Sequence, residues 1–379
     1  MNIYFDNAAT TPLDPEVFEA MRPFFLQDFG NPSSTHAHGR KVRAAIESSR
    51  KTIAGLLNCT PGEIIFTSGG TESINCILSG AVQAYSPSAI ITSRIEHHAV
   101  LHTVEELARR IKVEYVDLDE QGNVDLDHLR HLLRENEAAL VTLMQANNEI
   151  GNLLDIREVG EMCAASGAYF HSDTVQAVAH YRHNLKDTSV HAISAAAHKF
   201  HGPKGAGFMY IRKDKKIGPY IFGGGQERNF RGGTEHVAGI VGLCKALEIA
   251  YSHLDDHTAH IQNLKSRMIS RLKEGIPDVR FNGNSDDLDK SLYTVLNVSL
   301  PESDGNDMLL FNLDLMGISV SGGSACSSGA STGSHVLQAL NPGEKRGAIR
   351  FSFSKFNTVE EVDFVAARLA ELFLHEKAG

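Results

Sequence analysis

The sequence lacks an excess of basic residues, since 36 Lys and Arg face 46 Asp and Glu and the net charge is −10. No block of Lys and Arg dominates a face, and the short run at residues 212–216 is typical of a solvated turn. Nucleic-acid binding proteins usually need such a basic face, because phosphate contacts supply most of their affinity. We therefore expect no nucleic-acid partner.

Cysteines are also few, and long apolar runs are missing. The five cysteines form no Cys-x-x-Cys pair, which argues against a zinc ribbon or a redox dithiol, and their wide spacing favours a reducing compartment. There is no run of about 18 apolar residues and no export signal at the start of the sequence. We expect a cytoplasmic protein without a membrane span.

Short apolar segments alternate with helical patterns between about residues 60 and 250. Strands separated by helices of ten or more residues require crossover connections, so the pattern predicts an α/β fold with a mostly parallel central sheet flanked by helices. We assign residues 15–255 to this large domain. The predicted strands are Ile64–Thr67, Ala89–Thr92, Val113–Val116, Leu140–Leu143, Ala168–His171 and Val190–Ile193.

The pattern changes after about residue 255. A long helix (His253–Ile276) is followed by two scattered strands (Thr294–Leu300 and Ile349–Ser354) and a last helix (Val359–His375). We predict a smaller α+β domain made of residues 256–379 together with residues 1–14. Within it, residues 321–334 are almost entirely Ser, Gly and Ala around Cys326, which predicts a mobile loop.

Ligands of such sheets bind beyond the carboxyl ends of the strands. There, Phe66–Ile74 leads from a strand through Gly69-Gly70 into a helix that we expect Thr71 to cap. Glycines and a helix N-terminus suit a phosphate group, although the segment matches neither the Walker motif nor Gly-x-Gly-x-x-Gly. An ordinary glycine-containing turn explains this segment equally well.

Two further residues follow predicted strands, Asp173 and Lys199. A pyridine-ring cofactor needs a carboxylate on its protonated nitrogen and a lysine for covalent attachment. Taken singly, Asp173 is explained by a helix cap and Lys199 by an exposed loop. Their joint occurrence with the phosphate cradle is what favours a cofactor site.

The chain resembles the class V aminotransferase family, a group of fold-type I pyridoxal-phosphate transferases. Within it, the chain is similar to cysteine desulfurases of the NifS and IscS type, which carry a Ser-Ala-Cys-Ser loop. The resemblance extends almost from end to end. The matching segments are Tyr4–Pro12, Gly30–Ser34, Phe66–Glu72, Glu96–Val100, Asn147–Gly151, His171–Gln176, His198–Gly205, Gly223–Arg228 and Gly323–Ser327.

The resemblance implies pyridoxal 5'-phosphate as the cofactor and assigns residues to it. Lys199 would bind it covalently, Asp173 would pair with its ring nitrogen, and Gln176 would contact its ring hydroxyl. His97 would stack on the ring and assist proton transfer. The remaining cofactor-binding residues would be Gly70, Thr71 and His198 at the phosphate, with Asn148 and Thr234.

The resemblance also implies the substrate, L-cysteine, and a homodimer. Asn148 and Arg350 would hold the carboxylate of the substrate. Thr234 would reach the phosphate bound to the neighbouring subunit, so that the active unit has two chains. A sulfur acceptor such as an iron–sulfur scaffold protein would be a further partner.

Two features depart from the family pattern. Ala196 occupies the place of a serine that usually contacts the phosphate, so we expect weaker cofactor retention unless Ser194 or water substitutes for it. The chain also stops shortly after the last helix, where relatives that deliver sulfur to a scaffold often have a longer tail. The identity of the acceptor is therefore open.

Cys326 determines the expected reaction. Sulfur transfer needs a thiolate that attacks the sulfur of the substrate and then carries the persulfide away from the cofactor, which a cysteine in a flexible loop can do. Cys59, Cys76, Cys163 and Cys244 instead have the pattern of small core residues. We expect L-cysteine to become L-alanine, with sulfur supplied for iron–sulfur clusters or other thio-cofactors.

Three alternatives have different requirements. A selenocysteine lyase would use the same site, whereas a class V aminotransferase would not need Cys326. A non-catalytic metal-binding protein is suggested by the 19 histidines, including the pairs His36/His38 and His97/His98. No third ligand converges on either pair, so we expect no metal site.

Overall fold

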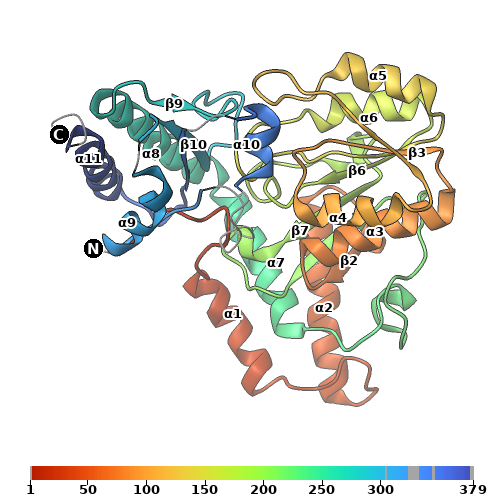
Figure 1. Cartoon of the computed structure of the whole chain (residues 1–379). Coiled ribbons are helices and arrows are strands. Elements are labelled where there is room, and N and C mark those ends of the chain that lie inside the picture. The colour runs from red at the N-terminus through yellow and green to blue at the C-terminus, as the bar shows by residue number, and fades with distance from the viewer. Residues whose placement is uncertain (1, 304, 323–332, 344–345, 376–379) are drawn as a thin grey trace.

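The computed structural model describes residues 2–303, 305–322, 333–343 and 346–375. Figure 1 shows a large lobe built around a central sheet and a smaller lobe that carries both chain ends. Among the described residues, no single helix is long and apolar enough to cross a bilayer. The helices α7 (Val237–Ser252) and α8 (Leu254–Gly275) reach that length and composition only as a pair, with a 76° bend between them.

The large lobe contains a seven-stranded sheet in the order β2-β8-β7-β6-β5-β3-β4. All neighbouring strands run parallel except at β8, which is antiparallel to both β2 and β7. Most strands are buried on both faces, as is typical of parallel sheets covered by helices. Their bounds are β2 Ile64–Thr67, β3 Ala89–Thr92, β4 Lys112–Tyr115, β5 Leu140–Thr142, β6 Tyr169–Asp173, β7 Ala192–Ala196 and β8 Gly207–Ile211.

Two hydrophobic cores lie on the two faces of this sheet. Alternate residues of one strand enter different cores, because side chains in a strand alternate between faces: Phe208 and Tyr210 join one core, and Met209 and Ile211 join the other. The first core is covered mainly by α1 (Pro15–Leu26), α2 (Ala37–Leu56), α5 (Leu126–Glu135), α6 (Ile156–Ala165) and α7. The second core is covered by α3 (Gly70–Tyr85) and α4 (His98–Leu107).

The small lobe has an antiparallel sheet of β12 (Gly347–Ser352), β10 (Val295–Leu300) and β9 (Arg280–Phe281). The N-terminal β1 (Ile3–Tyr4) pairs in parallel with β11 (Ile318–Ser319), so the start of the chain joins this lobe. A separate core fills the lobe between the sheet and α8 and α11 (Val359–His375). The remaining helices are α9 (Leu309–Leu315) and α10 (His335–Leu340).

The fold class predicted from sequence is confirmed, and each of the six predicted strands of the large domain overlaps an observed strand. The domain boundaries stay a prediction. One local expectation was wrong, since α3 begins at Gly70 and its N-cap is Gly69. Gly69 has φ +151°, which L side chains rarely adopt, so the N-cap lies two residues before Thr71.

Candidate active site

A cavity of about 230 Å³ opens at the carboxyl ends of the strands in the large lobe. Nine residues that the sequence singled out line it together: Gly70, Thr71, His97, Asn148, Asp173, Gln176, His198, Lys199 and Arg350. Asp173 and Ala196 are the last residues of β6 and β7, which places their side chains at the sheet edge. The two lobes together therefore gather residues that are up to 280 positions apart, counting from Gly70 to Arg350.

The start of α3 forms one end of the cavity. A β-carbon added to Gly70 would lie 2.7 Å from Cγ2 of Val175, so only glycine lets the helix begin this close to the loop after β6. The first N–H groups of a helix have no partner within the helix, and they attract anions. Together with Thr71, this end fits a phosphate group.

Asp173 is 5% exposed and suits a cation, in contrast to the start of α3, which attracts anions. Its Oδ1 accepts hydrogen bonds from the Val175 N–H (3.0 Å) and from Ser194 Oγ (3.1 Å). Burial raises the pKa of Asp173, while these hydrogen bonds and the charge of Lys199 act in the opposite direction. A buried carboxylate in this position fits a cationic partner such as a protonated pyridine nitrogen.

Lys199 is held by the N-terminal segment, which the sequence analysis quoted without giving it a role. Lys199 Nζ donates to the carbonyl oxygens of Ala8 (2.6 Å) and Ala9 (3.0 Å). Thr11 Oγ1 donates to the carbonyl of His198 (3.0 Å) and accepts from the His201 N–H (2.7 Å). The N-terminal segment therefore binds Lys199 itself and the residues on both sides of it. The match of this segment to the family motif was the signal that could have indicated its place at the site.

His97 lies at the N-cap of α4, where its Nδ1 accepts from the Ala99 N–H (3.1 Å). Burial, followed by the charge of Lys199, lowers the pKa of His97 to about 4. The ring is therefore neutral near pH 7 and carries its proton on Nε2. Such a ring can stack on a cofactor and donate one hydrogen bond. Gln176 donates from Nε2 to the Ala8 carbonyl (3.0 Å), so the same segment also orients this side chain.

Arg350 lies on β12 of the small lobe and is only 1% exposed. Its Nη1 donates to the carbonyl of Asn148 (2.8 Å), and its Nη2 forms an ion pair with Oδ1 of Asp6 (2.7 Å). Within the part of the chain that the structure describes, its buried Nε has no hydrogen-bond partner. A buried cation with a spare donor fits a carboxylate ligand.

Two predicted site residues do not line the cavity. Thr234 is exposed and lies outside it, and its role at a neighbouring subunit stays a prediction. Cys326 belongs to residues 323–332, which lie outside the described residues. The other four cysteines are free and lie away from the cavity, and burial raises the pKa of each thiol, to about 11 for Cys244 and about 12 for the rest.

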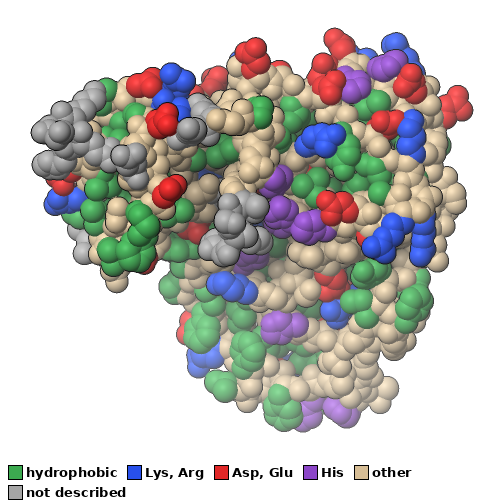
Figure 2. Space-filling view, in the orientation of Figure 1, with side chains coloured by type: hydrophobic (Ala, Val, Ile, Leu, Met, Phe, Trp, Pro, Cys, Tyr) green, Lys and Arg blue, Asp and Glu red, His purple; other side chains and the backbone are tan. Residues whose placement is uncertain are grey.

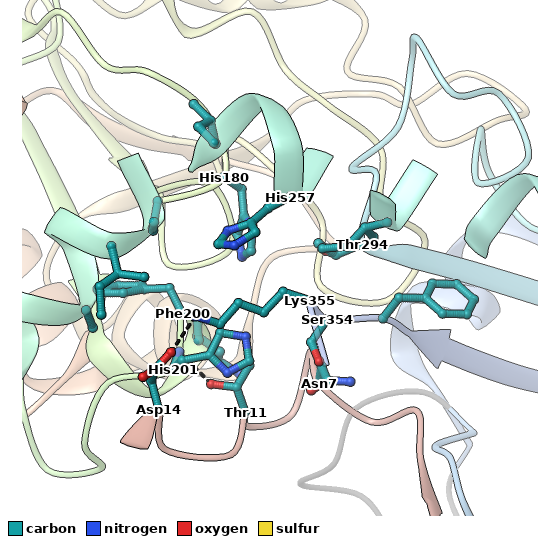
Figure 3. Close-up of a pocket in the computed structure, with 18 of the residues that line it drawn as sticks. Asn7, Thr11, Asp14, His180, Phe200, His201, His257, Thr294, Ser354 and Lys355 are labelled. Atoms are coloured by element: carbon teal, nitrogen blue, oxygen red, sulfur yellow. Dashed lines mark hydrogen bonds and ion pairs between the residues drawn. The ribbon is translucent and has the colours of Figure 1, made fainter. Parts of the chain in front are cut away.

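Figure 3 shows a second, smaller cavity of about 40 Å³. It lies beside the first and shares Ala8, Gln176 and Lys199 with it. Lys355 points across it toward Asp14, and His180 and His257 lie on the opposite side. Burial lowers the pKa of His180 to about 4, so that its ring is neutral near pH 7. This space fits a few water molecules, which excludes it as a substrate site.

The donor set of the main cavity therefore fits pyridoxal phosphate: a helix start for the phosphate, a buried carboxylate for the ring nitrogen, and an amine for the aldehyde. Among the described residues, no group of three or more His, Cys, Asp or Glu side chains is arranged to hold a metal ion.

Comparison with known proteins agrees with this geometry. The family model for aminotransferase class-V matches residues 3–365. A cysteine desulfurase IscS of Dictyoglomus turgidum is 44% identical over 369 residues, covering 96% of this chain and 92% of that protein. A putative cysteine desulfurase, IscS 1 of Bacillus subtilis, is 41% identical and covers 98% of each chain.

Solved structures are similar to this chain over nearly its whole length. A NifS-like protein superposes with a TM-score of 0.90 at 38% identity, covering 98% of this chain and 99% of that one. The sequence, the pocket and these relatives together place the chain in the class-V aminotransferase family and, within it, among the cysteine desulfurases, which are pyridoxal-phosphate enzymes.

Proposed function

We propose that the protein converts L-cysteine to L-alanine and transfers the sulfur atom to Cys326 as a persulfide. The observation that carries this is the single cavity in which the amine of Lys199, the carboxyl of Asp173 and the guanidinium of Arg350 meet. The curated relatives with this function match the whole length of the chain, which supports the same reaction here.

The cofactor would be held at three points. The start of α3, Thr71 and His198 would bind the phosphate, Asp173 would keep the ring nitrogen protonated, and Lys199 would form the covalent link. When bound, pyridoxal phosphate supplies an aldehyde that captures the substrate amine and a ring that accepts the electron pair released at Cα.

The protein's own groups then have distinct tasks. Arg350 and Asn148 bind the substrate carboxylate and so orient the Cα–H bond. The Lys199 amine moves the Cα proton, and the neutral ring of His97 stays next to it without repelling it. The Cys326 thiolate attacks the sulfur of the substrate: an S–S bond forms, the C–S bond breaks, and the released carbon takes up a proton to become alanine.

The partners follow from exposed surfaces and from the product. Phe222, on the segment that leads to Thr234, is 83% exposed, and Phe25 at the end of α1 is 55% exposed and lies against His236, with ring centroids 6.4 Å apart. Such side chains support burial against a second copy. The homodimer would bring Thr234 to the phosphate of its partner, and a sulfur-acceptor protein of the cytoplasm, such as an iron–sulfur scaffold, would take the persulfide.

The test uses the purified protein loaded with pyridoxal phosphate. With L-cysteine we expect alanine in the absence of a reductant, in an amount that matches the sites, and a peptide containing Cys326 that is heavier by one sulfur atom. Cys326→Ser should form no persulfide there and should stop alanine formation.

Other outcomes contradict the proposal in distinct ways. Release of a keto acid, with full turnover in Cys326→Ser, would identify an aminotransferase. A strong preference for selenocysteine over cysteine would identify a selenocysteine lyase.

A further inference from the structure

The N-terminus of α10 is fastened to the two turns that flank the active site. Ser334 caps the helix by accepting from the Leu337 N–H (3.1 Å), and its Oγ donates to Oε2 of Glu149. His335 Nε2 donates to the carbonyl of Glu96 (2.9 Å). Glu149 directly follows Asn148, and Glu96 directly precedes His97, so both fastening points adjoin predicted site residues.

Glu149 is a fully buried carboxyl group that the reaction described above does not use. Its Oε1 has no hydrogen-bond partner among the described residues, and His335 Nδ1 lies 4.0 Å away. The Glu96 carbonyl can only accept, so His335 must carry a proton on Nε2 and, when neutral, presents the lone pair of Nδ1 to the carboxylate. Two acceptors then face each other unless one of them binds a proton, and the carboxylate has no access to water although the ring is 25% exposed.

The surroundings favour such a proton. Burial raises the pKa of Glu149, although the Ser334 hydrogen bond and the charges of His335 and Arg350 act in the opposite direction. The ring of His98 on α4 lies 4.5 Å from that of His335, and its buried Nδ1 also lacks a partner among the described residues. The carboxyl of Glu96 lies in the adjoining turn, where burial raises its pKa to about 8.

The main chain at Glu149 is held by hydrogen bonds that do not involve its carboxyl group. Its carbonyl accepts from Asn297 Nδ2 (3.0 Å) on β10, and the neighbouring Asn148 carbonyl accepts from Arg350 on β12. The carboxyl group therefore lies where three elements meet: the loop after β5, the small sheet and α10. Histidines gather near the centre of this face of the molecule (Figure 2).

We propose that Glu149 and His335 share one proton, and that Glu149 is thereby a positioning residue that holds α10 against the substrate end of the active site. Gly333 follows Cys326 by seven positions in the sequence and adjoins Ser334, so α10 is the first described helix after Cys326. The inference rests on the proposed function, because it concerns the step in which Cys326 receives sulfur.

The direction of the pH effect follows from the raised pKa of Glu149. The folded protein favours the protonated pair, so the fastening is complete at low pH and is lost as the pH rises through the value of the folded state. Sulfur transfer to Cys326 should then fall at alkaline pH, even though the thiolate becomes more abundant there.

Glu149→Gln tests this inference, since the amide keeps an acceptor for Ser334, offers an N–H to His335 and cannot titrate. We expect single-turnover alanine formation to lose its alkaline decline in Glu149→Gln. The absorbance change when cysteine meets the bound cofactor should stay as in the wild type, because that step does not need Cys326. Ser334→Ala should slow alanine formation at every pH, and the exposed control Glu135→Gln should match the wild type.

An alkaline decline in Glu149→Gln identical to that of the wild type would overturn the proposal. If that variant does not fold, His335→Gln removes the other member of the pair while Glu149 can still titrate. The midpoint of the alkaline decline should then shift, and an unshifted midpoint is equally decisive. Failure of the proposed function is a separate result, because the wild type itself would then form no alanine from cysteine.

Discussion

Replacement of Ala196 by serine should strengthen cofactor binding. Ala196 ends β7 with its side chain lining the cavity beside Gly70, Thr71 and His198, and it is 2% exposed. Ser194 lies on the same side of the strand, but its Oγ already donates to Asp173, so it does not substitute for a phosphate ligand. A hydroxyl at position 196 would add the missing donor.

The size of the effect follows from the charge of the phosphate. A hydrogen bond to a charged group contributes roughly 1.5–3 kcal/mol, which corresponds to a Kd for pyridoxal phosphate lowered about 10- to 150-fold. Without the cofactor, the same hydroxyl faces a cavity large enough for water, which can satisfy it. The apo form of Ala196→Ser should therefore unfold at about the same temperature as the wild type, whereas the loaded form should unfold at a higher temperature.

Equilibrium dialysis of the cofactor measures the affinity directly, and thermal unfolding with and without cofactor measures the stability. Ala195→Ser is the matched control, because Ala195 points to the opposite face of β7 into the core and does not line the cavity. It should lose stability in both forms without a gain in affinity. Equal cofactor affinity of Ala196→Ser and the wild type would refute the idea that this position faces the phosphate.

Three further outcomes are expected. Arg350→Lys loses the forked guanidinium that contacts the Asn148 carbonyl and would bind the substrate carboxylate, so KM for cysteine should rise by about tenfold or more with a smaller change in kcat. An unchanged KM in steady-state kinetics would contradict this. Glu227→Gln removes the buried carboxylate partner of Arg50 (2.8 Å) and leaves it only the more exposed Glu47 (3.3 Å). It should cost about 3 kcal/mol, seen as a lower thermal midpoint, while the exposed Glu106→Gln should change little. Burial lowers the pKa of His180 from 6.5 to about 4, so as the pH falls from 6.5 to about 4 the unfolded chain binds this proton before the folded protein does, and stability is lost. His180→Gln should therefore show a shallower fall in thermal midpoint over that range. Parallel plots of thermal midpoint against pH for the variant and the wild type would contradict the assignment.

Strands that obey a local rule were predictable from the sequence. The six apolar segments between helical patterns became β2 to β7, because a strand buried on both faces needs apolar residues throughout. The strand β8 (Gly207–Ile211) has the same composition but was not predicted. Only a short 3-10 helix (Ala197–Lys199) separates it from β7. Its antiparallel position between β2 and β7 depends on pairing with a segment about 140 residues earlier in the chain.

In the candidate site, too, some residues were predictable from local sequence patterns and others were not. Gly70, Asp173 and Lys199 follow predicted strands, and the sheet edge gathers such positions, so their convergence could be expected from the residues alone. Arg350 comes from the small lobe, and only the family resemblance placed it at the site. No local pattern tells how one lobe packs against the other.

The contacts that the sequence analysis missed share one property: the protein supplies them with main-chain atoms. The Ala8 and Ala9 carbonyls accept from Lys199, and the Asn148 carbonyl accepts from Arg350. Every residue has a carbonyl, so residue type does not mark these positions, and alanine at positions 8 and 9 indicates only that no side chain is needed there. The segment is constrained from the other side as well, because the Ala8 N–H donates to Ser352 Oγ (2.8 Å) and the Asn7 side chain donates to the Ser352 carbonyl (2.8 Å). The N-terminal segment thus connects the small sheet directly to the catalytic lysine, and a substitution that displaced its backbone would disturb Lys199 without altering any residue that the chemistry names.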